Sequence, residues 1–460
     1  MDPNVDTRPT SRPGERDTRW FRSALFAIVA GALVLRVTYV IVSRRNFDPH
    51  GDAFFYHAAA NLLAHGKGFI SPFFVTAGLH REAAEHPPLY IIFLAIPSVL
   101  GMKSVIVHML WSCLLGAATV GLIGLLGRAV GGARVGVIAA FIAAVYPNLW
   151  APDGMLQAET LSMFAAAGTL LLAYQYWRRP SGRRLVLVGA ACAFGALARS
   201  ELILLIPLMV VPLAWFTRDR SWKIRVHWIG ASVLAAAIVI APWTIYNTTR
   251  FVHPVLLSAQ IDPLLASANC YSTYYGGLQG YFDIRCAATI AKQHHLTLKD
   301  DESQENVIYR HEAIEYVRHH LGRVPHVEGV RLLRIAGLYK PSLYVHADTL
   351  IEGRSPLWIS WAALYSFWFL AVLSIAAPII GRRRRNGEGT RRVPLYPLLM
   401  PIVVVVVTVL VTYASTRFRT SAEPSFVVLA AIAIDGAIAM FSTTRARPPA
   451  DRPAHEGAYS

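Results

Sequence analysis

The chain has 460 residues, of which 54% are hydrophobic and only 16% are charged, and its mean hydropathy is +0.41. A soluble core of this size does not need so many apolar residues, so the composition excludes a soluble globular protein and indicates a membrane protein. The formal net charge is +16. Most Lys and Arg residues stand in short clusters between apolar runs, which indicates membrane topology rather than nucleic-acid binding.

The apolar runs are long enough to be tested as membrane spans. The hydrocarbon core of a bilayer is about 30 Å thick, so a spanning helix needs roughly 20 apolar residues. We predict an all-α polytopic bundle of about ten transmembrane helices. The candidate spans are 23–43, 104–127, 135–150, 159–177, 185–198, 202–216, 226–247, 356–380, 394–413 and 425–441. Around Arg199 two alternatives remain open: two short helices that turn there, or one long kinked helix.

One further apolar run, residues 87–101, decides the orientation of everything after it. As a helix it reaches only about 22 Å, and Pro87-Pro88 suits a helix start. If this run lies in the membrane interface, all the basic clusters fall on the side of the basic N-terminus, as the positive-inside rule requires. The Arg-rich and Ala-rich composition is typical of bacteria with GC-rich genomes. We therefore predict a multi-pass protein of the bacterial plasma membrane with both termini cytoplasmic.

This topology divides the chain into five parts. They are a cytoplasmic basic tail at 1–22, an N-terminal transmembrane module at 23–247 with the first outer loop at 44–103, a long extracytoplasmic loop at 248–355, C-terminal transmembrane helices at 356–442 and a cytoplasmic tail at 443–460. Apolar residues at helical spacing predict an amphipathic helix within 303–321. Cys270 and Cys286 face an oxidising compartment in this topology, and they either form a disulfide or remain free thiols.

The first outer loop concentrates carboxylates and imidazoles at the predicted membrane edge. Asp52 and Tyr56 stand at the start of a short helical pattern, and Glu85 and His86 precede the interfacial helix. Two interpretations of Asp52 are open. Asp is a favoured N-cap residue, so it could simply cap a helix that begins at Ala53. Alternatively, the cluster carries out chemistry on the outer face.

A second acidic group, Asp153 and Glu159, lies at the outer end of another predicted span. A carboxylate at a helix N-terminus is favourable for the helix dipole, which explains Glu159 without any function. Both acidic groups face the same compartment, however, so Asp52, Asp153 and Glu159 could hold a divalent metal or orient a hydroxyl. The sequence leaves the metal open.

Arg36 lies within the first apolar run, where an Arg at the bilayer centre costs at least about 2.5 kcal/mol. A buried ion pair, a contact with a lipid phosphate or snorkelling to the interface would each reduce that cost. All three alternatives remain open at this point.

The order of these groups resembles a known family. The elements concerned are Asp52 with Tyr56, His86-Pro87-Pro88-Leu89-Tyr90, Glu159, Pro242-Trp243 with Asn247, and Arg417-Phe418-Arg419 with Glu423-Pro424. Together they resemble the polyprenyl-phosphate-dependent glycosyltransferases of the GT-C fold, in particular the superfamily of protein O-mannosyltransferases and lipid A aminoarabinose transferases. One departure is that protein O-mannosyltransferases place two acids together, whereas Ala53 follows Asp52 here.

The resemblance implies a GT-C bundle with juxtamembrane helices and a catalytic carboxylate in the first outer loop. Such an enzyme, a hexosyl- or pentosyltransferase, would move a sugar from a polyprenyl-phosphate donor to a glycan, lipid or protein acceptor of the cell envelope, with inversion. We expect Asp52 to be the base, and Arg417 and Arg419 to stabilise the phosphate leaving group. Ordinary flanking of a helix end is the alternative for both arginines. The other expected substrate-binding residues are Tyr56, Glu85, His86 and Glu159.

A transporter or flippase of lipid-linked sugars is the second functional hypothesis. Such a protein would show inverted repeats and interrupted helices with polar groups near the midplane. The sequence has no convincing internal repeat, and its polar clusters lie at the predicted outer edge. The retained outer acids also disfavour a non-catalytic scaffold. An extracytoplasmic active site is therefore the favoured prediction.

Overall fold

The computed structural model describes residues 13–217, 220–297, 300–350, 352–385 and 393–445. Within these residues the regular secondary structure is helical, apart from one isolated antiparallel bridge between Ile70 and Glu82. The predicted all-α architecture is therefore confirmed.

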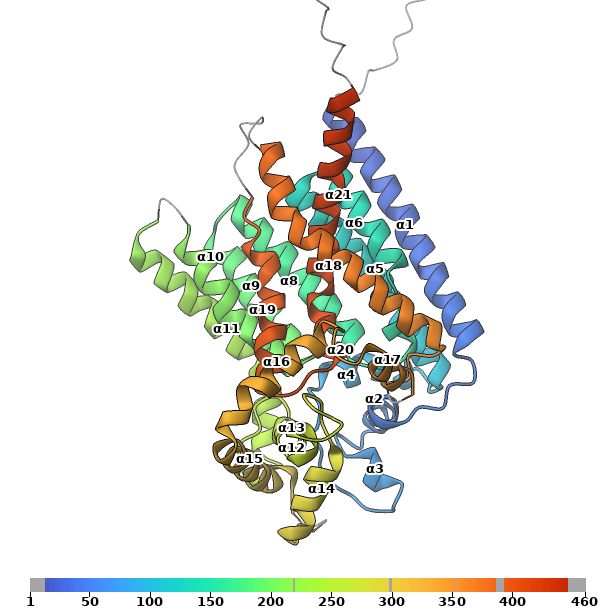
Figure 1. Cartoon of the computed structure of the whole chain (residues 1–460), viewed down its shortest axis with the longest axis vertical. Helices are drawn as coiled ribbons and strands as arrows, with labels where there is room; N and C mark the ends of the chain where they lie inside the picture. Colours follow the sequence, from blue (N-terminus) through green and yellow to red (C-terminus); the bar gives the residue numbers. More distant parts are fainter. Residues whose placement is uncertain (1–12, 218–219, 298–299, 351, 386–392, 446–460) are drawn as a thin grey trace, which may run out of the picture.

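Long helices form an upright bundle (Figure 1). The bundle contains α1 Pro13–Ser43, α5 Val105–Gly131, α6 Ala133–Val145, α7 Pro147–Trp150, α8 Glu159–Arg178, α9 Gly182–Ala196, η2 Ser200–Leu204, η3 Ile206–Val210, α10 Val211–Trp215, α11 Trp222–Thr248, α18 Leu357–Arg385, α19 Tyr396–Val411 and α21 Glu423–Arg445. Helices cover every predicted apolar run. Among the described residues, five helices are long and apolar enough to cross a membrane, or six if the pair bent by 71° at 133–154 is one span. The count of ten spans stays a prediction.

The two alternatives around Arg199 are now decided in favour of two helical segments. Helix α9 ends at Ala196 and η2 begins at Ser200, with Arg199 in an extended conformation between them. Helix α9 packs closely against α11 at Gly189, where an added Cβ would lie 2.5 Å from the carbonyl oxygen of Ser232. Small residues at helix interfaces allow this kind of close backbone approach in membrane proteins.

A buried ion pair lies inside the bundle. Arg36 Nε donates to Asp153 Oδ2 over 2.8 Å, and neither side chain is more than 1% exposed. Arg36 also donates to the carbonyl oxygens of Ala32 and Leu149, and the Thr160 hydroxyl donates to Asp153. Of the three alternatives for Arg36, the structure therefore shows the buried ion pair.

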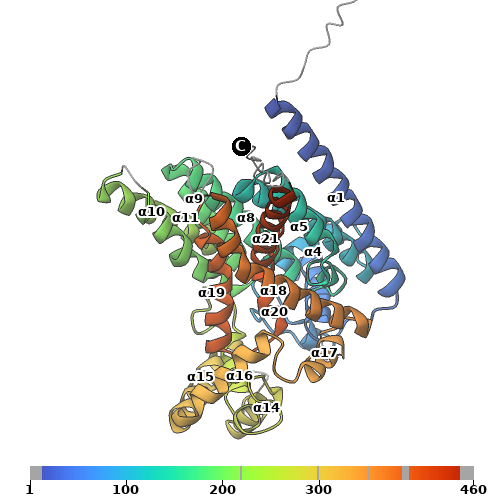
Figure 2. The ribbon, with the colours of Figure 1, turned by 45° about the horizontal axis from the view of Figure 1, so that its top comes forward.

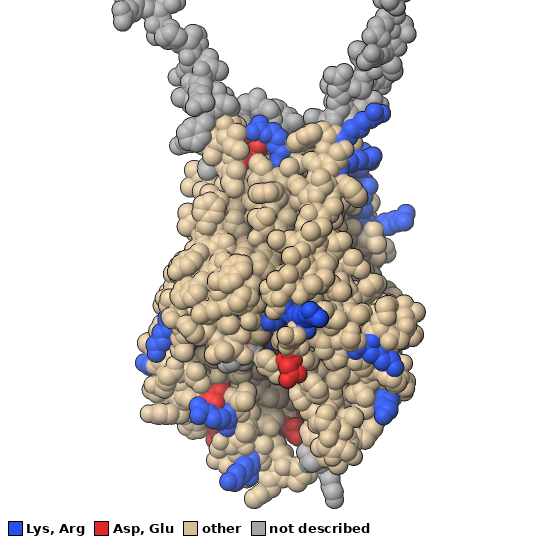
Figure 3. Space-filling model, turned by 90° about the vertical axis from the view of Figure 1, so that its right-hand side faces the viewer, with Lys and Arg blue, Asp and Glu red and all other residues tan. Residues whose placement is uncertain are grey.

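The two ends of the bundle differ in character. Helix α1 begins and α21 ends at the same end of the molecule (Figures 1 and 2). There Arg178 donates to the carbonyl oxygen of Ala129, and Arg134 lies 3.2 Å from Asp435. We call this the basic end. Figure 3 shows Lys and Arg at this end, a largely uncharged band beyond it, and charged residues again toward the opposite end. The predicted basic clusters at 382–385, 391–392 and 445–452 lie outside the residues whose side chains are described.

The opposite end, which we call the loop end, carries the short helices. They are α2 Gly51–Ala64, α3 Pro72–Val75, α4 Leu89–Val99, η1 Ala151–Gly154, α12 Ile261–Ala268, α13 Tyr271–Tyr274, α14 Ile284–Gln293, α15 Glu302–His319, η4 Leu321–Arg323, α16 Val324–Ile335, α17 Pro341–Leu350, α20 Thr416–Arg419 and η5 Thr420–Ala422. Figure 2 shows α14, α15 and α16 beneath the bundle.

Two expectations for the loop end are settled and one is not. Helix α15 covers the stretch 303–321, but the predicted apolar face is wrong: Val307 and Ile314 are 48% and 44% exposed, and the helix buries Asn306, Tyr309 and Ala313 instead. Cys270 and Cys286 form a disulfide, with their Cα atoms 6.4 Å apart. Helix α4 covers the run predicted to be interfacial and packs against α2 and α5. Its position relative to a membrane surface stays a prediction.

The orientation can be tested with a reporter that is active only in the cytoplasm. A reporter inserted after Gly131, at the basic end, should be active, because positive loops stay cytoplasmic. The matched insertion after Gly277, in the loop after α13, should be inactive. Reporter activity in cells measures both, and activity only at Gly277 would reverse the predicted orientation.

The buried pair predicts a large effect on stability. Asp153→Ala should lower the free energy of unfolding by roughly 3–5 kcal/mol, because it leaves Arg36 buried without a counter-charge. The double variant Arg36→Met/Asp153→Leu should recover most of that loss, since an apolar pair replaces both charges. Thermal unfolding in detergent micelles measures both variants. A double variant no more stable than Asp153→Ala would contradict this coupling.

Candidate active site

Asp52 lies in the first turn of α2 rather than at its cap. The helix begins at Gly51, which has φ +53, and His50 takes the N-cap position without a side-chain cap bond. The interpretation of Asp52 as the cap of a helix that starts at Ala53 is therefore wrong. Its carboxylate contacts Arg417 of α20 instead, and 25% of the Asp52 side chain remains exposed. Asp52 is thus accessible to a substrate.

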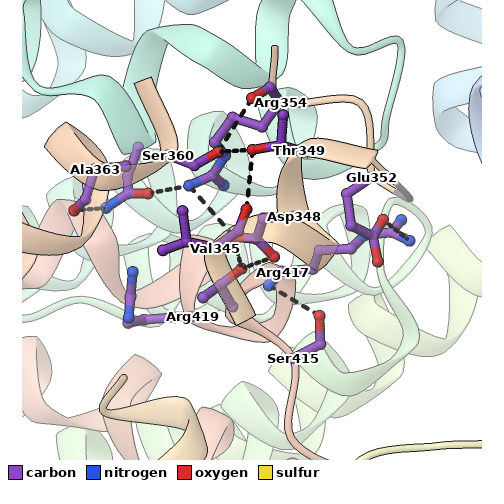
Figure 4. A network of polar contacts seen from close by, with 12 residues as sticks. Val345, Asp348, Thr349, Glu352, Arg354, Ser360, Ala363, Ser415, Arg417 and Arg419 are labelled. Carbon is purple, nitrogen blue, oxygen red and sulfur yellow. Dashed lines mark hydrogen bonds and ion pairs between the residues drawn. The ribbon is translucent and has the colours of Figure 1, made fainter. Parts of the chain in front are cut away.

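Arg417 joins three carboxylates from distant parts of the chain. Its Nη2 lies 2.7 Å from Asp52 Oδ2. Its Nε donates to Glu159 Oε1 over 2.6 Å, and its Nη1 donates to Glu352 Oε2 over 3.0 Å. Figure 4 shows Arg417 beside Glu352, with the Ser415 hydroxyl accepting from the Arg417 backbone. A planar guanidinium with five donors suits this arrangement. We call Asp52, Glu159, Glu352 and Arg417 the Arg417 cluster.

A second arginine supports Glu159 from the turn before η2. Arg199 Nη1 donates to Glu159 Oε1 over 2.7 Å, and Arg199 Nε donates to Glu201 Oε1 over 2.6 Å. The Arg199 guanidinium also lies 5.3 Å from the ring centre of Phe418. Only 2% of the Glu159 side chain is exposed, so these two guanidiniums compensate a charge whose burial would otherwise be costly. The helix dipole alone is therefore not the explanation for Glu159.

His86 and Tyr56 border Asp52. His86 Nε2 lies 3.6 Å from Asp52 Oδ1. The His86 ring centre is 4.7 Å from that of Tyr56 and 4.9 Å from that of Phe55. Tyr56 in turn meets Tyr90 edge to face at 5.1 Å. Burial raises the pKa of Tyr56 well above its ordinary value, so this phenol stays neutral. Two of the three predicted substrate-binding residues of this loop, Tyr56 and His86, thus lie beside Asp52.

The surroundings shift the pKa values of two cluster carboxyls in opposite directions. Burial raises the pKa of Asp52, but Arg417 and His86 outweigh burial and hold this pKa below its ordinary range. Burial raises the pKa of Glu352 to about 7, and Arg417 counters it only in part. Asp52 is therefore ionised at neutral pH, whereas Glu352 takes up a proton more readily than an ordinary carboxylate does.

Two predicted site residues do not join the cluster. Arg419 Nε donates to Glu423 Oε1 over 2.7 Å, and its guanidinium lies 3.5 Å from the ring centre of Phe367. Arg419 is buried and is bonded to Glu423, the first residue of α21. Its side chain therefore neither faces a position for the donor phosphate nor lies exposed beside a helix end, the two alternatives that the sequence left open. Glu85 accepts a hydrogen bond from Ser71 over 3.3 Å and lies beside the cluster without entering it.

The predicted metal set of Asp52, Asp153 and Glu159 does not come together. Asp153 pairs with Arg36 inside the bundle, and the guanidinium of Arg417 bonds both Asp52 and Glu159. Within the part of the chain that the structure describes, no group of three or more His, Cys, Asp and Glu side chains is arranged to hold a metal ion. Guanidinium groups provide the positive charge at this site.

Glu352 is a cluster member that sequence reasoning missed. The segment that carries it is fixed by Asp348, which accepts from the Thr416 hydroxyl over 2.8 Å and lies 3.8 Å from Arg354. Figure 4 shows Asp348 and Arg354 close to one another, with Ser360 beside them. A signal was available, because Glu352 is an acid just before the predicted span 356–380, at its outer end. Glu159 holds a similar place as the first residue of its own predicted span, 159–177.

Arg44 is a second missed residue, and it follows directly after α1. It is 4% exposed, its Nε donates to the Gly154 carbonyl over 2.9 Å, and its guanidinium lies 3.9 Å from the ring centre of Phe47. Its Nη2 has no hydrogen-bond partner, and no carboxylate among the described residues pairs with it. A Cβ on Gly353 would lie 3.5 Å from this Nη2. Arg44 thus stands next to the segment that carries Glu352.

One stretch of the chain matches the model of a known protein family. Residues 85–246 match the dolichyl-phosphate-mannose-protein mannosyltransferase family. This stretch contains His86 and Glu159, whereas Asp52 and Arg417 lie outside it. No curated protein sequence shows a significant match to the chain.

The fold is similar to that of solved membrane transferases. An oligosaccharyltransferase from Archaeoglobus fulgidus with a tethered acceptor peptide has a TM-score of 0.54 at 14% identity, over 93% of this chain and 50% of that one. AglB from the same organism, in complex with an inhibitory peptide and a dolichol-phosphate, has a TM-score of 0.53 at 14% identity. The match covers 93% of this chain and 51% of AglB. ArnT from Cupriavidus metallidurans, bound to undecaprenyl phosphate, has a TM-score of 0.42 at 14% identity. The match covers 92% of this chain and 81% of ArnT.

The present chain spans about half the length of the archaeal structures. Their similarity extends over nearly the whole of this chain and concerns the arrangement of its helices. The resemblance expected from the sequence is confirmed at this level, and the chain has the GT-C fold of membrane glycosyltransferases.

Proposed function

We propose that this protein is a membrane glycosyltransferase that moves a sugar from a polyprenyl-phosphate donor to a hydroxyl of a cell-envelope acceptor. The observation that carries the proposal is the contact of Arg417 with Asp52, Glu159 and Glu352 at the loop end of a GT-C bundle. The dolichol-phosphate bound by AglB supports the donor class. The predicted orientation puts this end in the extracytoplasmic compartment.

Asp52 is the base in this proposal. The acceptor oxygen attacks the anomeric carbon, the bond from that carbon to the phosphate oxygen breaks, and the hydroxyl proton passes to the Asp52 carboxylate. The polyprenyl phosphate leaves with the bonding electron pair. One direct displacement inverts the configuration. A phosphate monoester has a second pKa near 6, so it can depart at neutral pH without a general acid.

The donor phosphate needs positive charge that the resting cluster does not offer freely. Arg417 is already shared by three carboxylates, and the Arg199 guanidinium is divided between Glu159 and Glu201. Arg44, in contrast, has an unpaired Nη2 beside the Glu352 segment. A buried guanidinium without a counter-ion favours an anion strongly. Arg44 is therefore our candidate for the first phosphate contact.

Glu352 completes the proposed sequence of events. Its pKa of about 7 means that it takes up a proton readily when a phosphate anion approaches. A neutral Glu352 holds Arg417 less strongly, so Arg417 can turn toward the phosphate. Asp52 then loses part of the charge that depresses its pKa and becomes a stronger base. His86 and Tyr56 orient the acceptor or the sugar beside it.

The role of Asp52 predicts a large loss of activity. Asp52→Asn should reduce product formation by about a hundred- to ten-thousandfold, because an amide cannot accept the acceptor proton. The measurement is transfer of sugar in membranes supplied with polyprenyl-phosphate sugars. Asp48→Asn, an exposed acid of the same loop, is the matched control and should remain active. Full activity of Asp52→Asn would remove the proposed base.

The role of Arg44 predicts a loss of donor binding. Arg44→Met should raise the KM for the donor by about tenfold or more, since a charge-assisted hydrogen bond to phosphate contributes roughly 1.5–3 kcal/mol. The neighbouring exposed residue Arg45 gives the control Arg45→Met, for which KM should stay unchanged. Steady-state kinetics at varied donor concentration measure both. Equal effects of the two variants would point to general surface charge instead.

A further inference from the structure

The basic end of the bundle contains a cavity between two neighbouring helices. It has a volume of about 500 Å³ and lies where α8 ends and α9 begins. Figure 1 shows these two helices next to each other in the bundle. The polar and charged residues that line the cavity are Gln175, Arg179, Ser181, Arg183 and Arg184. None of the described residues that line it is acidic, and its volume is within the range of small-molecule sites.

The positive charge of this cavity is not neutralised by other described residues. The Arg184 guanidinium donates to the carbonyl oxygen of Arg179, which holds it at the cavity. The guanidiniums of Arg179 and Arg183 form no hydrogen bond or ion pair with another residue that the structure describes. Three cationic groups around one cavity repel each other, so together they favour an anionic ligand.

The turn between α8 and α9 is fixed without the help of these guanidiniums. The Ser181 hydroxyl accepts from the Arg184 amide and so caps α9. Gly182 packs against Trp228 of α11, and an added Cβ at Gly182 would lie 2.8 Å from the indole Nε1. The side chains of Arg179 and Arg183 are therefore free to contact a ligand.

An exposed apolar stripe continues from the cavity along α9. Leu187 lines the cavity and is 45% exposed, and Phe194 is 36% exposed. Arg183, Leu187 and Phe194 follow one another at spacings of four and seven residues, so they lie on one face of the helix. A free phosphate ion would contact only the cationic part of this surface. A phospholipid, which has a phosphate headgroup and apolar chains, matches both parts.

We propose that this cavity binds the headgroup of an anionic phospholipid. Arg179 and Arg183 contact the phosphate, because a guanidinium can donate two parallel hydrogen bonds to it. An acyl chain lies along Leu187 and Phe194. Basic pockets between transmembrane helices recognise anionic lipid headgroups in this way. The cavity is at the opposite end of the bundle from the Arg417 cluster, so this inference does not depend on the proposed function.

Lipid binding to the full chain in neutral detergent micelles tests the site, with phosphatidylglycerol as the probe and native mass spectrometry as the measurement. Arg179→Gln/Arg183→Gln should lower the affinity for phosphatidylglycerol by about tenfold or more, because it removes two charges that favour the headgroup. Arg19→Gln/Arg22→Gln removes the same charge from exposed positions of α1 at the same end, and should leave the affinity unchanged. Equal losses in the two double variants would overturn the site.

Two further measurements distinguish a lipid from other occupants. Leu187→Ser keeps the charge of the cavity but should also weaken phosphatidylglycerol binding, because it removes an apolar contact with the acyl chain. Inorganic phosphate at the concentration of the lipid should not displace phosphatidylglycerol. Unchanged binding to Leu187→Ser, together with displacement by phosphate, would identify a site for free phosphate and overturn the proposal.

A neutral lipid tests the requirement for negative charge. Phosphatidylcholine has the same phosphate but no net charge, so the unmodified protein should bind it about tenfold more weakly than phosphatidylglycerol. Equal affinities for the two lipids would contradict an anionic headgroup site. The substituted side chains of α8 and α9 are exposed, so all variants should unfold at the temperature of the unmodified protein when no lipid is added.

Discussion

The contacts of Arg417 hold together four segments that come from opposite ends of the chain. Asp52 belongs to the first outer loop, Glu159 to the start of α8, and Glu352 to the segment before α18. Glu159 and Glu352 are almost fully buried, with 2% and 9% of their side chains exposed. Buried carboxylates are costly unless they are paired and hydrogen-bonded. The same guanidinium therefore builds the site and fixes the loops around it.

This arrangement makes the resting site rich in carboxylates, and that affects which ligands it accepts. An anionic donor meets repulsion from the acids before it meets attraction from Arg417, whose donors are already engaged. Two groups reduce that repulsion. Glu352 is a carboxyl that can be neutralised, and Arg44 is a guanidinium with no carboxylate partner among the described residues. Electrostatic groups of this kind are effective because they are held in place before the substrate arrives.

Much of the fold follows from patterns that act locally. The length of each apolar run predicts a helix of the bundle, and the basic clusters predict that α1 begins and α21 ends on the same side. Both signals can be seen in the sequence because they depend only on neighbouring residues. The candidate site is partly predictable as well: the resemblance places Asp52, Glu159 and Arg417 in it, and Arg417 contacts both acids. These residues are recognisable because their types and order along the chain are characteristic of one family.

The predictions that the structure corrects depend on side-chain orientation and on contacts between distant parts of the sequence. Arg417 and Arg419 are two residues apart on a short helical turn, so their side chains point about 200° apart. Arg417 meets the acids, whereas Arg419 turns into the bundle toward Glu423. Asp153 looked like an outer-face ligand, but its partner Arg36 stands 117 positions away in the sequence. No local pattern contains that information.

The first outer loop is held by contacts with both the bundle and the outer helices. Arg417 holds it to the bundle through Asp52, while Glu302 holds it to the outer helices through the Ala84 amide. The 3.6 Å separation between Asp52 and His86 lies between these two anchors. Arg250 holds the same segment at the Glu82 carboxylate and at the Ala83 carbonyl, so several contacts together fix this separation. The environment of the base is therefore set jointly by the membrane bundle and by the helices that cover it.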